Sequence, residues 1–457
     1  MSRRASDRAD PARQERALSL RSPYDRRILA LALPALGALA AEPLYVLVDT
    51  AIVGHLGREP LAALGIAAAV LAGLFALFNF LAYSTTAQVA RASGAGESAT
   101  ALRLGAQALW LSLGIGVVLT GLTIGLAEPA VGLFGADGET ADLAVTYLRI
   151  AALGLPFGFV ALGGQGYLRG VADLRFPLVV LVAGNVLNAI LEVVFVYGFG
   201  WGIEGSAWGT VIAQAAMGSA FVIRIVSSVA GELRPRIDTA LVLLRLGRHI
   251  FVRTAALYGA LLVASAVAAR IGPDAIAGHQ VVVSLWFFLA LVLDAVAIAG
   301  QVLVGQALGA GDAHEAFAAG KRMIVLSVAA GGLLAAVLVG LADLLPHAFA
   351  DDPTVLDQVA LVWLVFALMQ PLGGAAFALD GILIGAGDGR YLMWSMVAAF
   401  AVSAGLSLAT LAAGWSLLGV WLAVLALLAV RVALLGVRFA QGRWQVTGWG
   451  DGPAAVS

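Results

Sequence analysis

Long apolar runs recur along this chain and constrain its fold more than any other feature. Runs rich in Ala, Leu, Val and Gly follow one another from residue 28 to residue 440, separated by short segments that carry Gly, Pro and charges. A helix needs about 20 apolar residues to cross a bilayer. Only 12% of the residues are charged, whereas a soluble domain has about 25%. The composition therefore excludes a water-soluble enzyme and predicts an all-α polytopic membrane protein.

The runs predict twelve transmembrane helices, with boundaries good to about four residues. The expected spans are 28–50, 61–84, 101–127, 140–163, 174–198, 203–226, 247–269, 276–303, 318–342, 355–379, 391–413 and 416–440.

Arginine placement predicts the orientation of these spans. One set of alternate loops holds most of the basic residues, from the N-terminal segment and Arg91 to the stretch Arg431–Arg443, while the other set is acidic. By the positive-inside rule the basic side is cytoplasmic. Both termini are then cytoplasmic, in a multi-pass protein of the cell (plasma or inner) membrane. Residues 1–27 hold eight arginines and four acids without an apolar core, which predicts a disordered basic head rather than a cleavable signal peptide.

An internal repeat organises the chain. A shift of 215 residues superimposes rare residue types, and near the end the shift falls to 214; the matches include Pro156 with Pro371, Gly166 with Gly381, Asp173 with Asp388 and Trp201 with Trp415. Six spans on each side of the joint make a parallel repeat, a pseudo-twofold axis along the membrane normal. The expected domains are a head (1–27), an N-lobe (28–226), a cytoplasmic linker (227–246), a C-lobe (247–440) and a tail (441–457). Two such lobes suit alternating access, although a duplicated structural bundle without transport is an alternative.

The first span carries two acids, and an ionisable group inside a span is a functional candidate. Glu42 and Asp49 are seven residues apart, so they share one helix face. Pro34 and Pro43 each remove an intrahelical hydrogen bond, which predicts a bend. The alternative for Asp49 is a carboxylate near the outer end that simply reaches the headgroups.

The fifth span carries a polar stripe. Asn185, Asn188 and Glu192 are spaced three and four residues apart, which places them on one side of a helix. Their oxygens could ligate a cation or hold a protonated carboxyl group. Structural hydrogen bonds between helices are the alternative.

The C-lobe carries different polar residues. Gln280 and Asp294 are fourteen residues apart on the eighth span, and Asp380 ends the tenth. Under the repeat shift Asp49 corresponds to Ala264, and Asp380 corresponds to Gln165. The two lobes therefore share a fold but should differ in role.

These segments resemble the multidrug and toxic compound extrusion (MATE) family, and in particular its DNA-damage-inducible F-type branch. The resemblance runs from about residue 25 to residue 440, and the segments that carry it are Glu42-Pro43, Asp49–Leu56, Ser84–Gln88, Ala277–Gln280 and Asp380–Gly385.

The resemblance implies secondary antiport driven by H⁺ or Na⁺. It implies that Asp49 is the coupling carboxylate, completed by Asn188, Glu192 and Thr210, with Pro34 at the bend and Tyr147 as a cavity partner. The fifth-span acid is usually Asp in the family, and the longer Glu192 favours a proton over a tight sodium cage. Na⁺ at Asp49, Asn188, Glu192 and Thr210 stays an alternative. A secondary polar cavity would comprise Glu42, Asn185, Gln280, Asp294 and Asp380.

The predicted function is export of small organic substrates, preferably cationic, by a monomer in the bilayer. We expect no catalytic residue, cofactor, structural metal or nucleic-acid partner. A lipid or lipid-linked oligosaccharide flippase is the first alternative, but it would favour arginines in the cavity, and only Arg149 and Arg253 are candidates. A membrane-embedded transferase is more remote, because its paired aspartates should be cytoplasmic and the pair Asp351-Asp352 is expected outside.

The arginine asymmetry generates a topology prediction, which the absence of native cysteine makes simple to test. In intact cells, single cysteines replacing Gly138 or Thr354 should react with a membrane-impermeant thiol reagent. A cysteine replacing Gly311 should react only after permeabilisation. Labelling of position 311 from outside would overturn the assigned orientation.

Overall fold

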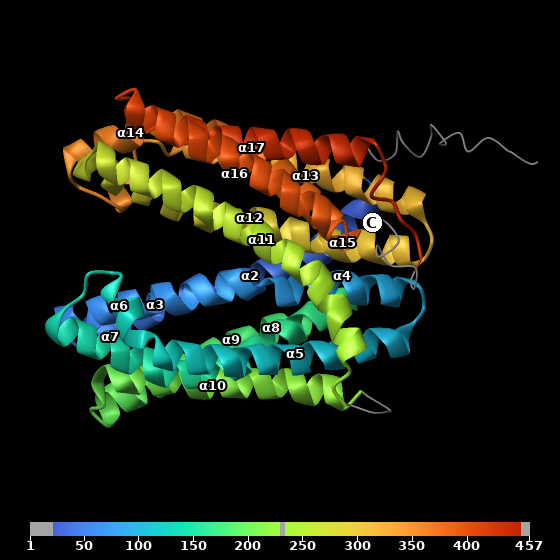
Figure 1. The fold of residues 1–457 in the computed structure, drawn as a ribbon, viewed down its shortest axis with the longest axis horizontal. Helices are drawn as coiled ribbons and strands as arrows, with labels where there is room; N and C mark the ends of the chain where they lie inside the picture. Colours follow the sequence, from blue (N-terminus) through green and yellow to red (C-terminus); the bar gives the residue numbers. More distant parts are fainter. Residues whose placement is uncertain (1–21, 229–233, 449–457) are drawn as a thin grey trace, which may run out of the picture. The chain divides into compact units, whose positions relative to one another are not determined.

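Helices make up most of the computed structural model, which describes residues 22–228 and 234–448 (Figure 1). Most of the predicted basic head and half of the predicted tail lie outside these residues. The helices of the first half are α2 (Pro23–Gly54), α3 (Arg58–Phe78), α4 (Phe80–Gly94), α5 (Ser98–Gly125), α6 (Ala127–Gly132), α7 (Gly138–Ala151), η1 (Ala152–Gly154), α8 (Leu155–Gly170), α9 (Arg175–Glu192), η2 (Val193–Gly198) and α10 (Gly202–Val226). Those of the second half are α11 (Ile237–Ile271), α12 (Pro273–Gly309), α13 (Ala313–Gly340), η3 (Pro346–Ala348), α14 (Pro353–Leu368), α15 (Gln370–Gly385), α16 (Gly389–Ala412) and α17 (Leu417–Ala440).

The prediction of an all-α membrane protein is confirmed. Eleven helical segments of the described chain are long and apolar enough to cross a membrane, and α14 with α15 makes a twelfth span bent by 50°. The bend has a local cause: Pro371 stands at the start of α15 and has no N–H for an intrahelical bond. In the first half Pro156 stands at the start of α8, where the short 3₁₀ turn η1 interrupts the matching span.

Several helix ends differ from the predicted spans. Helix α4 continues to Gly94, ten residues beyond the predicted end of the second span. Helix α11 begins at Ile237, so residues 237–246, predicted to lie in the linker, are helical. Helix α2 passes through both Pro34 and Pro43 as one helix, and its bend stays a prediction. The extra turns carry polar and charged residues, so they do not belong to the apolar runs from which the spans were predicted.

The chain forms two compact units. Unit 1 contains the described residues up to Leu33, then Ala256–Asp388 and the chain from Trp394 onward. Unit 2 contains Pro34–Ala255 and Gly389–Met393. Helices α2 and α11 therefore each begin in one unit and end in the other. The lobes predicted at 28–226 and 247–440 follow the sequence repeat. The two units follow the packing of the helices, so their boundaries differ from those of the lobes.

Equivalent glycines make equivalent close helix contacts in both halves. A Cβ added at Gly166 would lie 3.0 Å from the Cα of Ala82, and one at Gly381 would lie 2.8 Å from the Cα of Ala297. Both members of each pair are related by the same shift of 215 residues. The glycines that revealed the repeat are therefore places where two helix backbones touch, and side chains would separate them.

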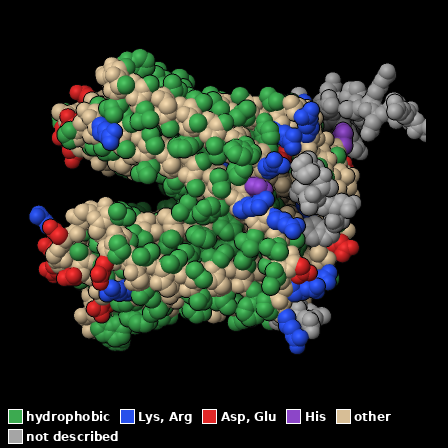
Figure 2. Space-filling model, viewed as in Figure 1, with side chains coloured by type: hydrophobic (Ala, Val, Ile, Leu, Met, Phe, Trp, Pro, Cys, Tyr) green, Lys and Arg blue, Asp and Glu red, His purple; other side chains and the backbone are tan. Residues whose placement is uncertain are grey.

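Charge is distributed along the helices as a membrane protein requires. On the face seen in Figure 2, hydrophobic side chains cover the middle of each unit, and the charged side chains gather toward the helix ends. Lys and Arg side chains prevail at one end of the helices, and Asp and Glu side chains prevail at the other. This pattern matches the arginine asymmetry of the sequence.

The glycine contacts predict a sharp difference between two neighbouring residues. A Cβ at Gly331 would lie 2.8 Å from the Cα of Pro371, whereas a Cβ at Gly332 would meet no atom within 4 Å. Gly331→Ala should therefore lower the free energy of unfolding by about 1–3 kcal/mol through overpacking. Gly332→Ala is the matched control and should leave the melting temperature in detergent unchanged. Equal effects of the two substitutions would contradict the close packing at this position.

Candidate functional site

Three helices of unit 2 bring two acids together. Asp49 lies on α2, Glu192 is the last residue of α9, and Ser206 lies on α10. The Ser206 hydroxyl donates to Asp49 Oδ1 at 2.8 Å and lies 3.4 Å from Glu192 Oε1. The two carboxyl groups also contact each other directly. All three side chains are buried, and Glu192 and Ser206 have no exposed surface.

Further hydroxyl and amide groups surround the acid pair. Asn188 Nδ2 donates to Glu192 Oε1 at 3.0 Å and lies 3.4 Å from Thr210 Oγ1. The Tyr45 hydroxyl is 3.1 Å from the same Thr210 oxygen. Tyr147, buried on α7, places its hydroxyl beside Thr210 and Ser206. The structure thus brings together five of the six residues predicted for the coupling site: Asp49, Asn188, Glu192, Thr210 and Tyr147.

Two buried oxygens of this cluster have spare acceptor capacity. Asn188 Oδ1 and Glu192 Oε2 have no hydrogen-bond partner among the described residues. A buried acceptor without a donor is costly, so such atoms mark a place where a proton or a cation would be stabilised. Nowhere in the described ranges do three or more His, Cys, Asp and Glu side chains form a group suited to a metal ion. The set of oxygens fits a proton or an alkali cation better than a transition metal.

Glycines and an irregular turn allow the helices to approach at this point. A Cβ at Gly209 would lie 3.1 Å from Glu192 Cγ, so a larger residue would press on the acid. Gly205 lies equally close to the backbone at Phe195 and Val196. Residues Val193–Gly198 form a π-helical turn directly after Glu192, and such turns often occur at functional sites.

Side chains on either side of Glu192 bind the backbone of α2. Asn185 Nδ2 donates to the carbonyl of Ala41 at 2.8 Å, and the Tyr197 hydroxyl donates to the carbonyl of Ile52 at 2.6 Å. These bonds lie before and after Asp49 along α2. Asn185 therefore does not join the acid cluster; it holds the helix that carries Asp49.

The remaining first-span residues lie apart from the cluster. Glu42 is exposed and has no hydrogen-bond or ion-pair partner among the residues that the structure describes. Pro34 is half-buried and is the first residue of unit 2. Neither touches the acid pair.

The polar residues predicted for a secondary cavity in the second half differ in their exposure. Gln280 is exposed, Asp294 is half-buried, and Asp380 is buried on α15. Asp380 forms an ion pair with Arg431 of α17, whose side chain is only 4% exposed. Arg431, assigned from the sequence to the cytoplasmic flank of the last span, is thus a buried helix residue. Because the buried Arg431 compensates the charge of Asp380, Asp380 cannot be compared directly with the acid pair of unit 2.

The repeat shows how differently the halves use equivalent positions. The counterparts of Asp380 and Arg431 are Gln165 and Met217, both uncharged. Ion pairs at the arginine-rich ends, in contrast, are retained: Arg224 lies 3.6 Å from Asp173, and Arg438 lies 2.6 Å from Asp388. The repeated pairs belong to the fold, whereas the pair Asp380–Arg431 is specific to the second half.

Sequence reasoning missed Ser206, Tyr45, Tyr197 and Arg431. Ser206 precedes Thr210 by four residues and Tyr45 precedes Asp49 by four, so helical spacing could have found both. Tyr197 bonds through an irregular turn that no periodicity predicts. Arg431 gave no signal, because an arginine near a span end usually reaches the headgroups.

Comparison with known proteins identifies the family. The model of the MatE family matches residues 34–194 and 250–409. The chain is 34% identical over 439 residues to Protein DETOXIFICATION 44, chloroplastic, of Arabidopsis thaliana, covering 92% of this chain and 83% of the relative. It is 33% identical over 429 residues to DNA damage-inducible protein F of Escherichia coli (strain K12), covering 89% and 90%.

The fold has close structural relatives as well. A MOP superfamily transporter from Pyrococcus furiosus Vc1 superimposes with a TM-score of 0.84 at 21% identity, covering 94% of this chain and 97% of that one. The family match extends over both halves of the repeat, as the internal shift requires. The chain therefore belongs to the MATE family of multidrug and toxic compound efflux transporters.

Proposed function

We propose that this protein exports small organic cations by antiport with protons, and that the acid pair Asp49–Glu192 couples the two fluxes. The observation that carries the proposal is the direct contact between two buried carboxyl groups that also lie near one serine hydroxyl. None of the described hydrogen-bond or electrostatic partners of these acids is basic. The pair is therefore stabilised by a proton or by a cation rather than by a resident positive charge.

A shared proton is the simplest way to keep such a pair in a membrane. Two carboxylates in contact repel each other strongly where water is excluded, because the local dielectric constant is low. Carboxyl groups that interact this closely gain and lose protons as a unit. Uptake of one proton lets one carboxyl donate to the other, and its release leaves an anionic site that attracts a cation.

Because a proton and a cationic substrate do not occupy the acid pair at the same time, the pair couples their movements in opposite directions. Facing outward, the pair takes up a proton and releases a cationic substrate. Facing inward, it loses the proton and can bind the next substrate. Alternating access between the two lobes separates these events across the membrane, with both termini in the cytoplasm and one chain as the working unit.

Sodium coupling is the second candidate, and the unpartnered oxygens favour it. Asn188 Oδ1 and Glu192 Oε2 have no donor among the described residues, and hard cations prefer carboxylate and amide oxygens. Export of a panel of dyes by everted vesicles, with a proton gradient in the presence and absence of Na⁺, separates the two ions.

The flippase alternative has less support. Arg149, one of two arginines proposed to face its cavity, is 48% exposed and forms an ion pair with Glu128 at 2.8 Å. That charge is compensated at a surface, where it would contribute little to holding a lipid phosphate.

The first functional prediction compares acids of the two halves. Asp49→Asn should abolish gradient-driven export without removing the protein from the membrane, because the pair then loses one titrating group. Asp380→Asn alone is a poor control, since it leaves Arg431 buried without its partner at a cost of about 3–5 kcal/mol. The double variant Asp380→Gln, Arg431→Met places the equivalent residues of the first half at both positions.

The double variant should keep coupled export within about twofold of the unaltered protein, since neither residue is assigned to coupling and uncharged pairs often replace buried ion pairs at little cost. Dye export in everted vesicles measures both variants. If the double variant loses coupling while Asp49→Asn keeps it, the coupling site lies in the second half.

The second functional prediction concerns pH. In detergent, affinity for a cationic dye should rise as pH rises, because the pair becomes anionic when its proton leaves. Glu192→Gln should move or flatten this transition. The double variant Asp49→Asn, Glu192→Gln should couple no worse than Asp49→Asn alone, because the two residues act as one unit. Additive losses with an unmoved pH profile would reduce Glu192 to a structural role.

A further inference from the structure

Helix α2 is shared between two units, which makes its first turns unusual. Residues up to Leu33 pack in unit 1, and Pro34 begins the part in unit 2 that carries Asp49. Pro34 has no N–H to donate to the preceding turn, so one intrahelical hydrogen bond is missing where the helix changes unit, and Pro43 removes a second one farther along. Helices α11 and α16 also divide between the two units.

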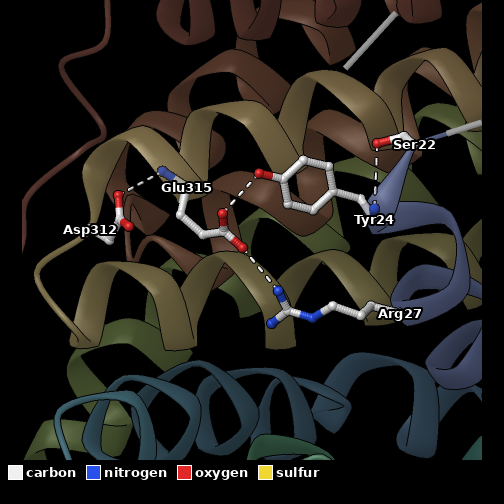
Figure 3. Close-up of polar contacts among 5 residues, drawn as sticks. All are labelled: Ser22, Tyr24, Arg27, Asp312 and Glu315. Carbon is white, nitrogen blue, oxygen red and sulfur yellow. Dashed lines mark hydrogen bonds and ion pairs between the residues drawn. The ribbon is translucent and has the colours of Figure 1, made fainter. Parts of the chain in front are cut away.

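Ionic contacts hold the first turns of α2 to α13 of the same unit. The Tyr24 hydroxyl donates to Glu315 Oε2 at 2.8 Å, and Arg27 Nη1 donates to Glu315 Oε1 at 2.9 Å (Figure 3). Asp312 caps α13 by accepting from the Glu315 amide at 2.8 Å. The cap fixes the position of Glu315, which in turn receives both donors of α2.

A second ion pair lies beside the first. Arg322 of α13 binds Asp25 through both carboxylate oxygens, at 2.6 and 2.8 Å. The Arg322 side chain is only 6% exposed, so water competes little for it. Bidentate pairs of this kind are among the stronger side-chain contacts. Asp25 also accepts from the Ser22 amide at 3.0 Å, which ties the ion pair to the start of the helix.

The repeat contains an equivalent contact in the other half. The counterpart of Arg322 is Gln107 on α5. Its buried amide donates to the carbonyl of Arg234 at 2.9 Å and accepts from the amide of Arg236 at 2.7 Å, directly before α11 begins. The equivalent position in each half thus binds the chain at the start of the first helix of the opposite half. An ion pair makes this contact in one half, and hydrogen bonds from an amide make it in the other. Because the position recurs while the residue types change, holding the start of the helix is a property of the repeated fold.

The geometry points to a permanent anchor: contacts of Tyr24, Asp25 and Arg27 with Glu315 and Arg322 keep the start of α2 on unit 1 throughout transport. Flexing of α2 is then confined to Pro34 and beyond, the part that carries Asp49. Arg322 and Glu315 act as positioning residues, through α2, and do not bind substrate. The inference rests on the alternating access proposed above.

Cross-linking tests permanence. Tyr24→Cys and Glu315→Cys are introduced together into the cysteine-free chain and joined by a reducible bis-methanethiosulfonate reagent that spans the two side chains. Because a thiol reacts faster as pH rises, the linking rate is divided by the reaction rate of the single-cysteine variants at the same pH. This ratio should be the same at low and high pH and with or without a saturating cationic dye. The linked protein should export dye as fast as the same variant after reduction, and the single-cysteine variants control for modification.

Loss of export on linking, restored by reduction, would show that the anchor opens in each cycle and would overturn the inference. A normalised linking rate that changes with pH or with dye would do the same. The cross-linking rate is measured without transport, so it tests the anchor even if the proposed antiport fails.

A charge exchange tests positioning. Asp25→Asn or Arg322→Gln should lower the initial export rate several-fold, because the bidentate pair no longer holds the start of α2, with dye affinity in detergent unchanged. Asp25→Arg combined with Arg322→Asp should recover most of the rate. Asp388→Asn is the matched control, because it breaks a neighbouring ion pair of unit 1 that does not involve α2, and it should leave the rate unchanged. Full rates in the single variants, or equal losses in the control, would contradict the anchor.

Discussion

The contact between the carboxyl groups of Asp49 and Glu192 is the interaction on which the rest of the first half depends. Each acid alone would be expensive inside a membrane, and the two together need suitable hydrogen-bond donors and either a proton or a cation. The fold supplies the donors through Ser206 and Asn188. It also supplies the space, since Gly209 lets α10 approach Glu192. The site forms where α2, α9 and α10 meet, so a shift of any one of these helices would separate its residues.

The second half solves the same physical problem in the opposite way. Asp380 is as deeply buried as Asp49, but Arg431 compensates its charge within unit 1. A compensated carboxylate has little reason to exchange a proton. The two halves therefore share a similar fold, in which one buried acid is paired with an arginine and the other lies beside a second acid. The uncharged counterparts Gln165 and Met217 show that the fold itself requires neither charge.

Periodicity and the repeat predicted the spans well, because apolar length and rare-residue matches report directly on membrane crossing and backbone contact. They did not predict that α11 starts at Ile237, since a helix can continue beyond the apolar run. Within the site, the residues of the stripe Asn185, Asn188 and Glu192 meet different partners. Asn185 is seven residues from Glu192, about 10.5 Å along a helix, so it reaches the Ala41 carbonyl of α2 instead. Spacing predicts a shared face and says nothing of which neighbour each residue meets.

Helix α2 connects these observations. Its middle carries one acid of the pair, and bonds from Asn185 and Tyr197 hold its backbone on both sides of that acid. A change in protonation alters the attraction between α2 and the helices that carry Glu192 and Ser206, because two carboxylates repel where a carboxyl and a carboxylate attract. The start of the same helix is held elsewhere, by Arg322 and Glu315. In the proposed cycle a force generated at Asp49 therefore acts on a helix held at its start, and Pro34 and Pro43, which each lack an N–H for an intrahelical bond, lie between the two points.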